Sequence, residues 1–371
     1  MEAPRRTRIL IVDDSVVMRS LLRAAICADA GLEVAGSAAD GESALRTVEM
    51  VHPDLVLLDV EMPVMDGLAT LREVRGRGHR MPVIMCSSLT QRGARVTIEA
   101  LAAGASDYVA KPAGQASREA ALQALSQELI PKIHALAGPA QPQPHLAGGP
   151  RTVCPAHLAQ QPIASPPTAL AIGVSTGGPA ALDVLLPALP ADFPLPVLIV
   201  QHMPELFTRL FAERLDGRCG LRVREAVEGD RVRAGSAYIA RGNWHMEVLA
   251  ALPDGSPPTL HLNQEPPENH CRPAVDALFR SVAAVYGAGA LAVVLTGMGS
   301  DGLAGCRAVR GQGGGVLAQD RATSTVWGMP GAVVQAGLAQ KVLPLDGLAS
   351  EILRLAGRRQ SEAHEIPKAT V

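Results

Sequence analysis

The chain has 371 residues, so two domains are expected rather than one. Hydrophobic residues make up 47% of it and aromatic residues only 2%, which favours aliphatic cores of buried parallel strands covered by helices. The 34 basic and 36 acidic residues leave a net charge of −2, which argues against a nucleic-acid-binding protein.

The cysteines and the N-terminus bear on the cellular compartment in which the protein is expected. Six cysteines are scattered and never form a CxxC pair, which is typical of reduced thiols in the cytosol. The N-terminus lacks a signal-peptide pattern, and no run reaches the ~18 apolar residues that a membrane span needs. We therefore expect a cytoplasmic protein without membrane insertion.

Strand and helix patterns alternate from Arg8 to about Ala137. Five strand–helix units in ~130 residues predict a doubly wound, five-stranded, flavodoxin-like sheet that binds a ligand at the carboxyl ends of its strands. The expected strands are 8–12, 32–38, 55–59, 83–87 and 107–110, and the expected helices are 16–28, 41–51, 66–77, 93–103 and 117–136.

Polar side chains follow these strands at the edge where the strands end. Asp13 and Asp14 follow the first strand, Asp59 ends the third, Ser87 ends the fourth, and Lys111 follows the fifth. Carboxylates gathered in this way repel one another unless a divalent cation lies among them, and oxygen ligands favour Mg²⁺ or Mn²⁺. Each residue alone could be a helix cap or a solvated strand end. Together they predict phosphoryl transfer to a carboxylate.

This segment resembles the response-regulator receiver domain. The resemblance rests on Leu-Ile-Val-Asp-Asp-Ser, Leu-Leu-Asp-Val-Glu-Met-Pro-Val-Met-Asp-Gly and Tyr-Val-Ala-Lys-Pro. It implies that a histidine kinase phosphorylates Asp59. It also implies two further groups of residues: Asp13, Asp14, Asp59 and the backbone carbonyl of Glu61 for Mg²⁺, and Ser87, Lys111 and the switch aromatic Tyr108 for phosphoryl sensing.

A composition shift separates this region from the rest of the chain. Residues 138–167 hold eight prolines and three glycines, with Arg151 their one charged residue, which is typical of a semi-extended linker. We expect a receiver domain over 5–137, a linker over 138–167, a catalytic domain over 168–357 and a flexible tail over 358–371.

Strand–helix alternation resumes after the linker and predicts a second doubly wound parallel sheet. A pair of short strands separated by Pro-Asp-Gly-Ser-Pro-Pro predicts a small hairpin next to it. The expected sheet strands are 170–174, 197–200, 236–239, 290–296 and 315–318, and the expected hairpin strands are 246–249 and 259–263.

Three reactive side chains follow strands of this second sheet. Ser175 lies in a G-x-S-x-G turn, the nucleophile-elbow pattern, and His202 is the one histidine of ten that directly follows a strong apolar strand. Asp301 follows the most apolar strand and could fix the imidazole tautomer. Each has an ordinary alternative: a common Gly-Ser turn, a structural histidine, and a cap on the following helix. The chain order Ser–His–Asp excludes the α/β-hydrolase fold, in which the histidine comes last.

The same residues leave two other classes of protein open. Gly297–Gly302 is a literal G-x-G-x-x-G after a strand, and Asp320 follows the next strand, as the ribose-binding acid of a nucleotide site would. A non-enzymatic, phospho-regulated binding module is the other alternative.

The second half of the chain resembles the chemotaxis protein-glutamate methylesterase and glutamine deamidase family. The motifs are Ile-Gly-Val-Ser-Thr-Gly-Gly-Pro, Val-Gln-His-Met-Pro, Arg-Pro-Ala-Val-Asp-Ala-Leu-Phe, Val-Leu-Thr-Gly-Met-Gly-Ser-Asp-Gly and Gln-Asp-Arg-Ala-Thr-Ser-Thr-Val-Trp-Gly-Met-Pro. The resemblance implies these catalytic roles: Ser175 as nucleophile, His202 as general base, Asp301 as its orienter, Thr176 as a second partner of His202, and the backbone N–H of Met298 in the oxyanion hole.

The resemblance also implies what the protein does. It would hydrolyse glutamate γ-methyl esters on methyl-accepting chemotaxis receptors and deamidate receptor glutamines, as a monomer with no cofactor in the esterase domain. The unphosphorylated receiver would cover Ser175, and phosphate on Asp59 would loosen that contact. Two places depart from the family pattern: Cys271, where a histidine often stands, and the turn Arg241–His245. Both put the substrate preference in doubt more than the chemistry.

Overall fold

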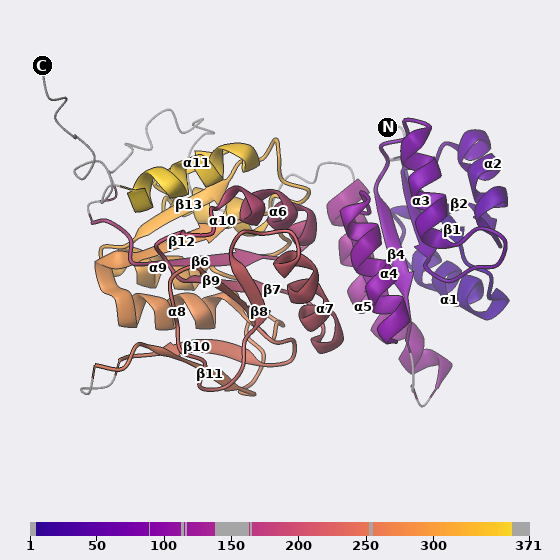
Figure 1. Cartoon of the computed structure of the whole chain (residues 1–371). Helices are drawn as coiled ribbons and strands as arrows, with labels where there is room; N and C mark the ends of the chain where they lie inside the picture. The colour runs from indigo at the N-terminus through magenta and orange to yellow at the C-terminus, as the bar shows by residue number, and fades with distance from the viewer. Residues whose placement is uncertain are drawn as a thin grey trace, which may run out of the picture. The chain divides into compact units, whose positions relative to one another are not determined.

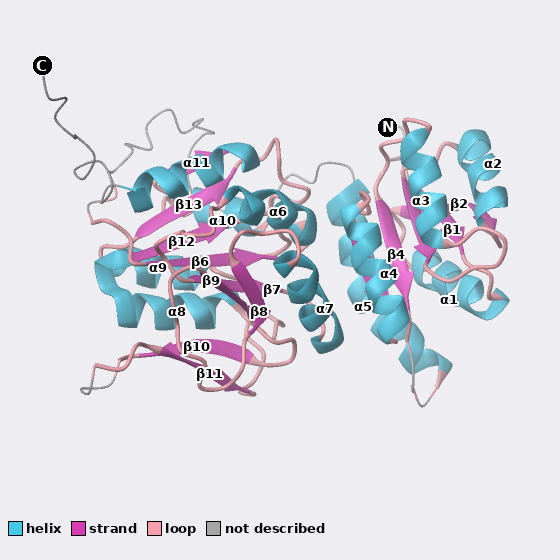
Figure 2. Ribbon diagram, viewed as in Figure 1, coloured by secondary structure: helices cyan, strands magenta, loops and turns pink. Residues whose placement is uncertain are grey.

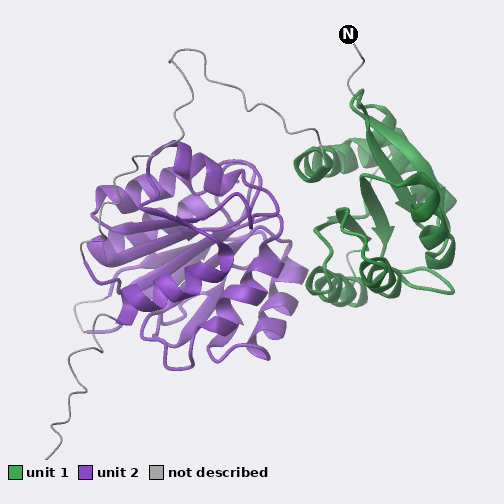
Figure 3. Cartoon of the chain, turned by 90° about the horizontal axis from the view of Figure 1, so that it is seen from above, with its two compact units in different colours: residues 1–154 green, residues 155–371 purple. Residues whose placement is uncertain are grey.

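The computed structural model describes residues 5–88, 90–112, 115, 117–137, 163, 165–251 and 255–357. The chain divides into two compact units, Met1–Cys154 and Pro155–Val371 (Figure 3). Most of the expected linker and the whole expected tail lie outside the described residues, so those domain boundaries remain predictions.

The first unit contains a parallel sheet (Figure 1), and its strand order is β2-β1-β3-β4-β5. Helices α1 and α5 pack together against the face that carries Ile9, Ile11 and Leu57, and α2, α3 and α4 form a second contiguous group. The strands are β1 (Thr7–Val12), β2 (Leu32–Ala38), β3 (Leu55–Asp59), β4 (Val83–Ser87) and β5 (Asp107–Ala110), and the helices are α1 (Val16–Cys27), α2 (Gly41–Val51), α3 (Gly67–Gly76), α4 (Gln91–Ala102) and α5 (Arg118–Ala137).

The first four helices begin where the sequence supplies a capping side chain. Ser15, Asp40, Asp66 and Thr90 each accept a hydrogen bond from the backbone N–H three residues further on. Such a cap satisfies one of the free N–H groups at the start of a helix and stabilises it by about 1 kcal/mol. These caps fix the loops that follow β1 and β3, and therefore the strand ends that carry the acidic residues.

The second unit contains a larger parallel sheet with the order β14-β13-β12-β6-β7-β9-β8. Helices α6 and α11 pack together on one face, and α8 and α9 on the other (Figure 2). The strands are β6 (Ala169–Val174), β7 (Val197–Gln201), β8 (Arg222–Glu225), β9 (Ser236–Ile239), β12 (Ala290–Val294), β13 (Gly315–Gln319) and β14 (Lys341–Leu343), and the main helices are α6 (Gly178–Leu185), α7 (Glu205–Asp216), α8 (Val275–Tyr286), α9 (Leu303–Gly311), α10 (Met329–Gln335) and α11 (Leu345–Ala356).

The strand order places a topological switch point at the middle of this sheet. From β6 the chain moves to β7 on one side, and it later returns to β12 on the other side of β6. Ligands of doubly wound sheets bind at the carboxyl ends of the strands at such a point. Ser175, His202 and Asp301 follow these three neighbouring strands.

The doubly wound architecture expected for both units is confirmed, and so is the hairpin, which is the antiparallel pair β10 (His245–Leu249) and β11 (Thr259–Asn263). The sequence patterns missed the two edge strands β8 and β14, which are short and carry charged residues. All four phenylalanines are buried in the second unit, so only the first has the expected purely aliphatic core apart from Tyr108. No helix among the described residues has the length and apolarity to cross a bilayer.

Candidate functional site

The strand ends of the first unit bring three carboxylates and one ammonium together. Asp13 is fully buried and Asp59 is 2% exposed, and Lys111 Nζ lies 2.8 Å from Asp13 Oδ2 and 2.7 Å from Asp59 Oδ2. Asp14 completes the group, whose oxygen atoms lie within 4.8 Å of one another. One lysine therefore faces three carboxylates, and the cluster keeps an excess of negative charge.

This cluster fits a divalent cation. Among the described residues, Asp13 Oδ2 is a buried atom without a well-aligned hydrogen-bond partner, although it forms an ion pair with Lys111. Burial and the charge of Asp13 raise the pKa of Asp59 to about 6, against the lowering effect of Lys111. Oxygen ligands with uncompensated charge are the donor set that Mg²⁺ prefers. Asp13, Asp14 and Asp59 would thus hold the ion, together with the carbonyl of Glu61.

Two of the predicted phosphoryl-sensing residues, Ser87 and Tyr108, lie on the neighbouring strands β4 and β5. Ser87 is buried, with its Oγ 2.7 Å from Thr97 Oγ1 of α4. Tyr108 is buried, and Lys132 Nζ lies 5.1 Å from the centre of its ring. Gly67 is required where it stands, because a Cβ there would lie 2.0 Å from the carbonyl oxygen of Asp59. The roles of Ser87 and Tyr108 stay predictions.

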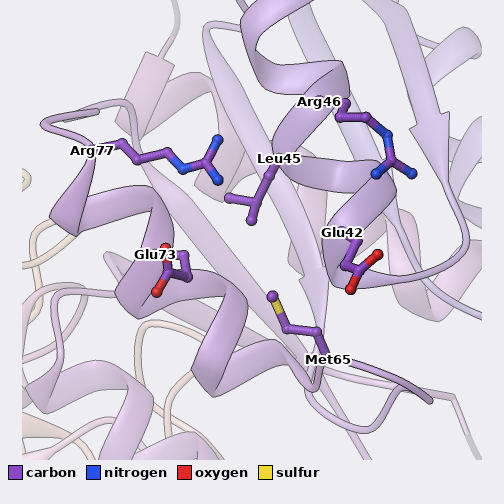
Figure 4. Close-up of a pocket in the computed structure, with 6 residues that line it drawn as sticks. All are labelled: Glu42, Leu45, Arg46, Met65, Glu73 and Arg77. Atoms are coloured by element: carbon purple, nitrogen blue, oxygen red, sulfur yellow. The ribbon is translucent and has the colours of Figure 1, made fainter.

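The first unit also has a surface pocket of about 310 Å³, which other residues line (Figure 4). It carries two acidic and two basic side chains, so its charge is balanced and it does not favour an anion. None of its lining residues belongs to the predicted site: they are Glu42, Leu45, Arg46, Met65, Glu73 and Arg77.

In the second unit, glycines shape the turn that carries Ser175. Gly177 has a φ of 78°, in the left-handed region, and a Cβ there would lie 2.4 Å from Thr325 Oγ1. A Cβ at Gly178 would lie 2.0 Å from Gln201 Oε1. The small residues therefore allow the chain to turn sharply from β6 into α6 and leave Ser175 partly exposed at the helix start.

His202 and Asp301 meet as the sequence predicts. His202 Nε2 lies 2.8 Å from Asp301 Oδ2. Because a carboxylate only accepts hydrogen bonds, this contact places a proton on Nε2 and leaves Nδ1 as the basic nitrogen when the ring is neutral. Within the described residues Ser175 Oγ makes no hydrogen bond to His202, so the serine–histidine contact stays a prediction.

Asp301 is also a helix cap, although of a different helix from the one the sequence suggests. Its Oδ2 accepts a hydrogen bond from Val275 N at 2.7 Å, and its Oδ1 accepts one from Asp276 N at 3.1 Å. These are the first two residues of α8, whereas the sequence alternative was the following helix, α9. The carboxylate therefore lies at the positive end of α8, which favours its ionised form. Burial raises the pKa of Asp301, but His202 and the two backbone donors outweigh burial and lower it.

The Nδ1 atom of His202 faces Cys271, one of the two places where the sequence departs from the family pattern. Cys271 Sγ lies 3.5 Å from it. Burial by itself lowers the pKa of His202, but the hydrogen bonds and charges of Asp301 and Cys271 outweigh burial and raise this pKa to about 9. The thiol therefore lies beside the nitrogen that would receive the proton of Ser175.

Two positioning residues were missed in the sequence. Gln201 is buried at the end of β7, and its Nε2 donates to the carbonyl oxygens of Ser175 at 3.0 Å and His202 at 3.2 Å. Asn269 Nδ2 donates to Asp301 Oδ1 at 3.0 Å. A polar amide at the end of an apolar strand, directly before the histidine, was a usable sequence signal for Gln201. Nothing in the sequence pattern pointed to Asn269, because its partner is 32 residues away.

The structure describes the surroundings of the other two predicted catalytic groups, Met298 and Thr176. Among the described residues the backbone N–H of Met298 takes part in no hydrogen bond, and Met298 as a whole is 37% exposed. Thr176 is buried, and its carbonyl oxygen accepts from Thr296 Oγ1 at 2.9 Å. Both roles stay predictions, the oxyanion contact of Met298 and the contact of Thr176 with His202.

The nucleotide-binding alternative is not favoured by this geometry. Asp301 is 1% exposed and accepts from Gly302 N at 2.9 Å, so a buried carboxylate lies where a pyrophosphate would have to bind at the start of α9. Asp320 accepts from the backbone N and the Oγ1 of Thr323, at 2.9 and 2.7 Å, and so caps its own loop.

Comparison with known proteins agrees with both halves of the chain. Residues 170–352 match the CheB methylesterase family model, and residues 9–123 match the response regulator receiver domain model. A protein-glutamate methylesterase/protein-glutamine glutaminase of a Nocardioides species is 50% identical, over 95% of this chain and 96% of its own length. This chain belongs to that family.

A second full-length relative and one solved structure are also similar to this chain. A protein-glutamate methylesterase/protein-glutamine glutaminase of Trichodesmium erythraeum is 47% identical over 94% of this chain and 99% of its own. The crystal structure of the Thermotoga maritima CheB methylesterase catalytic domain is 41% identical, with a TM-score of 0.49, over 51% of this chain and 98% of that one. A receiver domain generally implies Mg²⁺ for phosphorylation and a histidine kinase as phosphodonor. The methylesterase family generally acts on chemoreceptors.

Proposed function

We propose that this chain is a phosphorylation-controlled protein-glutamate methylesterase that also deamidates glutamine, acting on the methylated helices of chemoreceptors. The observation that supports it most is the 2.8 Å hydrogen bond from His202 Nε2 to the buried Asp301, next to the Ser175 turn at the switch point of the sheet. This is the base-and-orienter pair of a serine hydrolase.

In the esterase reaction a proton moves from Ser175 to His202 and then from His202 to the leaving group. Ser175 Oγ attacks the γ-carbonyl carbon of the methyl ester and gives its proton to His202 Nδ1, while Asp301 stabilises the imidazolium that forms. The C–O bond to the methoxy group breaks, and His202 returns the proton to it, so methanol leaves. A water molecule then cleaves the acyl-serine by the same route and releases a glutamate carboxylate. The Met298 N–H would stabilise the oxyanion, a type of contact that contributes about 3 kcal/mol.

The deamidation of glutamine follows the same course with a different leaving group. Attack on the γ-amide breaks a C–N bond, and His202 protonates the nitrogen so that ammonia leaves. An amide nitrogen leaves less readily than a methoxy oxygen, so this proton transfer matters more. The raised pKa of His202, about 9, keeps the imidazolium protonated near neutral pH, so its proton is available when the nitrogen leaves.

The first unit would control the second through phosphate on Asp59. Its Oδ2 atom lies 2.7 Å from Lys111 Nζ, and this ammonium would hold a phosphoryl oxygen once the acyl phosphate has formed. Bound Mg²⁺ would supply positive charge that neutralises the phosphoryl oxygens. Asp13 and Asp14 would bind that ion. We propose that this phosphorylation raises esterase activity.

Methanol release from methylated receptor membranes tests the catalytic assignment. Ser175→Ala should reduce the rate by about 10⁶-fold, the scale of nucleophile loss in serine hydrolases. Ser300→Ala is the matched control, because Ser300 is an exposed serine in the Gly297–Gly302 turn, and it should keep the rate. A Ser175→Ala variant that still releases methanol would show that another group is the nucleophile.

A small phosphodonor tests the control. Acetyl phosphate with Mg²⁺ should accelerate methanol release by the unmodified chain and should leave the rate of Asp59→Ala unchanged. Equal acceleration of both would remove Asp59 from the proposal.

A further inference from the structure

The free side of the catalytic imidazole carries a second metal-ligating atom. His202 Nδ1 and Cys271 Sγ are 3.5 Å apart. A tetrahedral zinc ion with bonds of about 2.0–2.1 Å to nitrogen and about 2.3 Å to sulfur spans about 3.6 Å between those two ligands. The two atoms therefore already have the separation that one zinc ion requires.

The far side of the same imidazole is held as it is in zinc proteins. A histidine that ligates zinc usually donates its other ring N–H to a carboxylate, and here His202 Nε2 does so to Asp301. The oxygens of Asp301 also accept from Val275 N, Asp276 N and Asn269 Nδ2, at 2.7 to 3.1 Å. Although Asp301 lies within reach of the cluster, its lone pairs are in use, so it would orient the histidine and not ligate the ion.

Cys271 is fixed in place by a tight turn. Glu268 and Cys271 exchange two backbone hydrogen bonds, at 3.1 and 2.7 Å, around Asn269 and His270, whose φ values of 51° and 63° lie in the left-handed region. Glu268 is tied in turn to Arg280 of α8 by two contacts of 2.9 and 2.6 Å. The turn thus fixes the position of the Cys271 thiol. Cys271 is partly exposed, so an ion can reach it.

We propose that His202 and Cys271 form a reversible inhibitory site for a thiophilic divalent cation such as Zn²⁺. Binding forms a bond from Nδ1 and a bond from Sγ to the ion. The Cys271 thiol releases its proton to solvent, and so does Nδ1 wherever the His202 ring is protonated. The lone pair that would accept the Ser175 proton is then occupied, so the hydrolase is switched off. This consequence rests on the proposed esterase function, whereas the binding does not.

The number and type of ligands determine which ion binds and how tightly. Structural zinc sites have four protein ligands, whereas His202 and Cys271 supply two and leave the other positions to water. Binding should therefore be reversible by a chelator. A thiolate and an imidazole favour Zn²⁺ and Cd²⁺ strongly over Mg²⁺, which the oxygen cluster of the first unit prefers.

Binding is tested without reference to activity. Cd²⁺ added to the full chain should produce sulfur-to-metal charge-transfer absorption in the ultraviolet. About one equivalent of this signal should be lost in both Cys271→Ser and His202→Ala. It should be kept in Cys27→Ser and His261→Ala, which replace an exposed cysteine and a histidine of the hairpin. If Cys271→Ser gives the unmodified signal, the proposed site is refuted.

Inhibition is tested on methanol release. Zn²⁺ should inhibit the unmodified chain, a chelator should restore the rate, and Mg²⁺ at the same concentration should not inhibit. The Zn²⁺ concentration for half inhibition should rise at least about tenfold in Cys271→Ser, because even the loss of an outer-shell partner usually weakens metal binding by that factor. Equal inhibition of both chains would overturn the inhibitory role. Absence of methanol release in zinc-free unmodified enzyme, with the Cd²⁺ signal intact, would refute the esterase function instead.

Discussion

Both units carry buried carboxylates at the carboxyl ends of a parallel sheet, yet the two sites differ in how those charges are compensated. In the first unit, Asp59 and Asp13 share one lysine, and Asp13 Oδ2 has no well-aligned hydrogen-bond partner among the described residues. In the second, Asp301 accepts hydrogen bonds from His202, Asn269 and three backbone N–H groups.

The pKa values follow this difference. Burial dominates at Asp59 and raises its pKa to about 6, whereas at Asp301 the donors outweigh burial and lower the pKa. A carboxylate that the protein leaves undercompensated can respond to a cation or a phosphoryl group. One that the protein fully compensates remains ionised and holds its partner in one orientation. The first site is therefore suited to switching and the second to catalysis.

The largest test of this contrast is the substitution Asp301→Asn. It removes the charge that stabilises the His202 imidazolium, and its amide favours the wrong ring tautomer. We expect kcat for methanol release to fall by about 10⁴-fold, as for the corresponding change in serine proteases. The control is Asp346→Asn, an exposed carboxylate in the first turn of α11, which should leave kcat unchanged. A fall of less than tenfold in Asp301→Asn would mean that the helix-capping role of this residue is its main one.

The next largest effect should appear in the pH dependence. The ring of His202 must be neutral to accept the Ser175 proton, and its pKa is raised to about 9. Below that pH the rate constant kcat/KM should rise about tenfold per pH unit, and it should level off above it. Cys271→Ser removes one of the groups that raise this pKa, so its profile should shift to lower pH. A profile that is flat from pH 7 to 9, or a shift to higher pH, would contradict the assignment.

Much of this arrangement could be predicted from the sequence, because strand ends of a parallel sheet meet at one edge. That rule was enough to bring Asp13, Asp59 and Lys111 together, and to pair His202 with Asp301. The rest depends on long-range geometry that no local pattern contains. Asp301 caps α8, which begins 26 residues before it in the chain, because α8 crosses the sheet next to β12 and β6. The 3.5 Å contact of Cys271 with His202 likewise spans 69 residues.

In the first unit, removal of a carboxylate should stabilise the fold. The pKa of Asp59 is raised in the folded chain, so folding favours its protonated form. The free energy of unfolding is therefore highest at low pH and falls as the pH rises from about 4 to about 6, where Asp59 becomes ionised in the folded chain. At pH 7 without Mg²⁺, Asp59→Asn should therefore raise the free energy of unfolding of this unit by about 2 kcal/mol. Mg²⁺ should stabilise the unmodified chain and have little effect on the variant. Denaturant unfolding monitored with EDTA or with Mg²⁺ measures both, and a destabilised Asp59→Asn would contradict the account.

The smallest effect tests whether compensation at Asp301 is spread over several donors. Asn269→Ala removes one of these donors and leaves the His202 hydrogen bond in place. The loss of one hydrogen bond among several is worth about 1 kcal/mol, so kcat should fall about fivefold with KM unchanged. Asn263→Ala on β11 is the matched control, since Asn263 bonds to Glu247 within the hairpin, and it should leave kcat unaffected. If Asn269→Ala lowered kcat as far as Asp301→Asn does, one amide and not the whole set of donors would keep that carboxylate in its catalytic state.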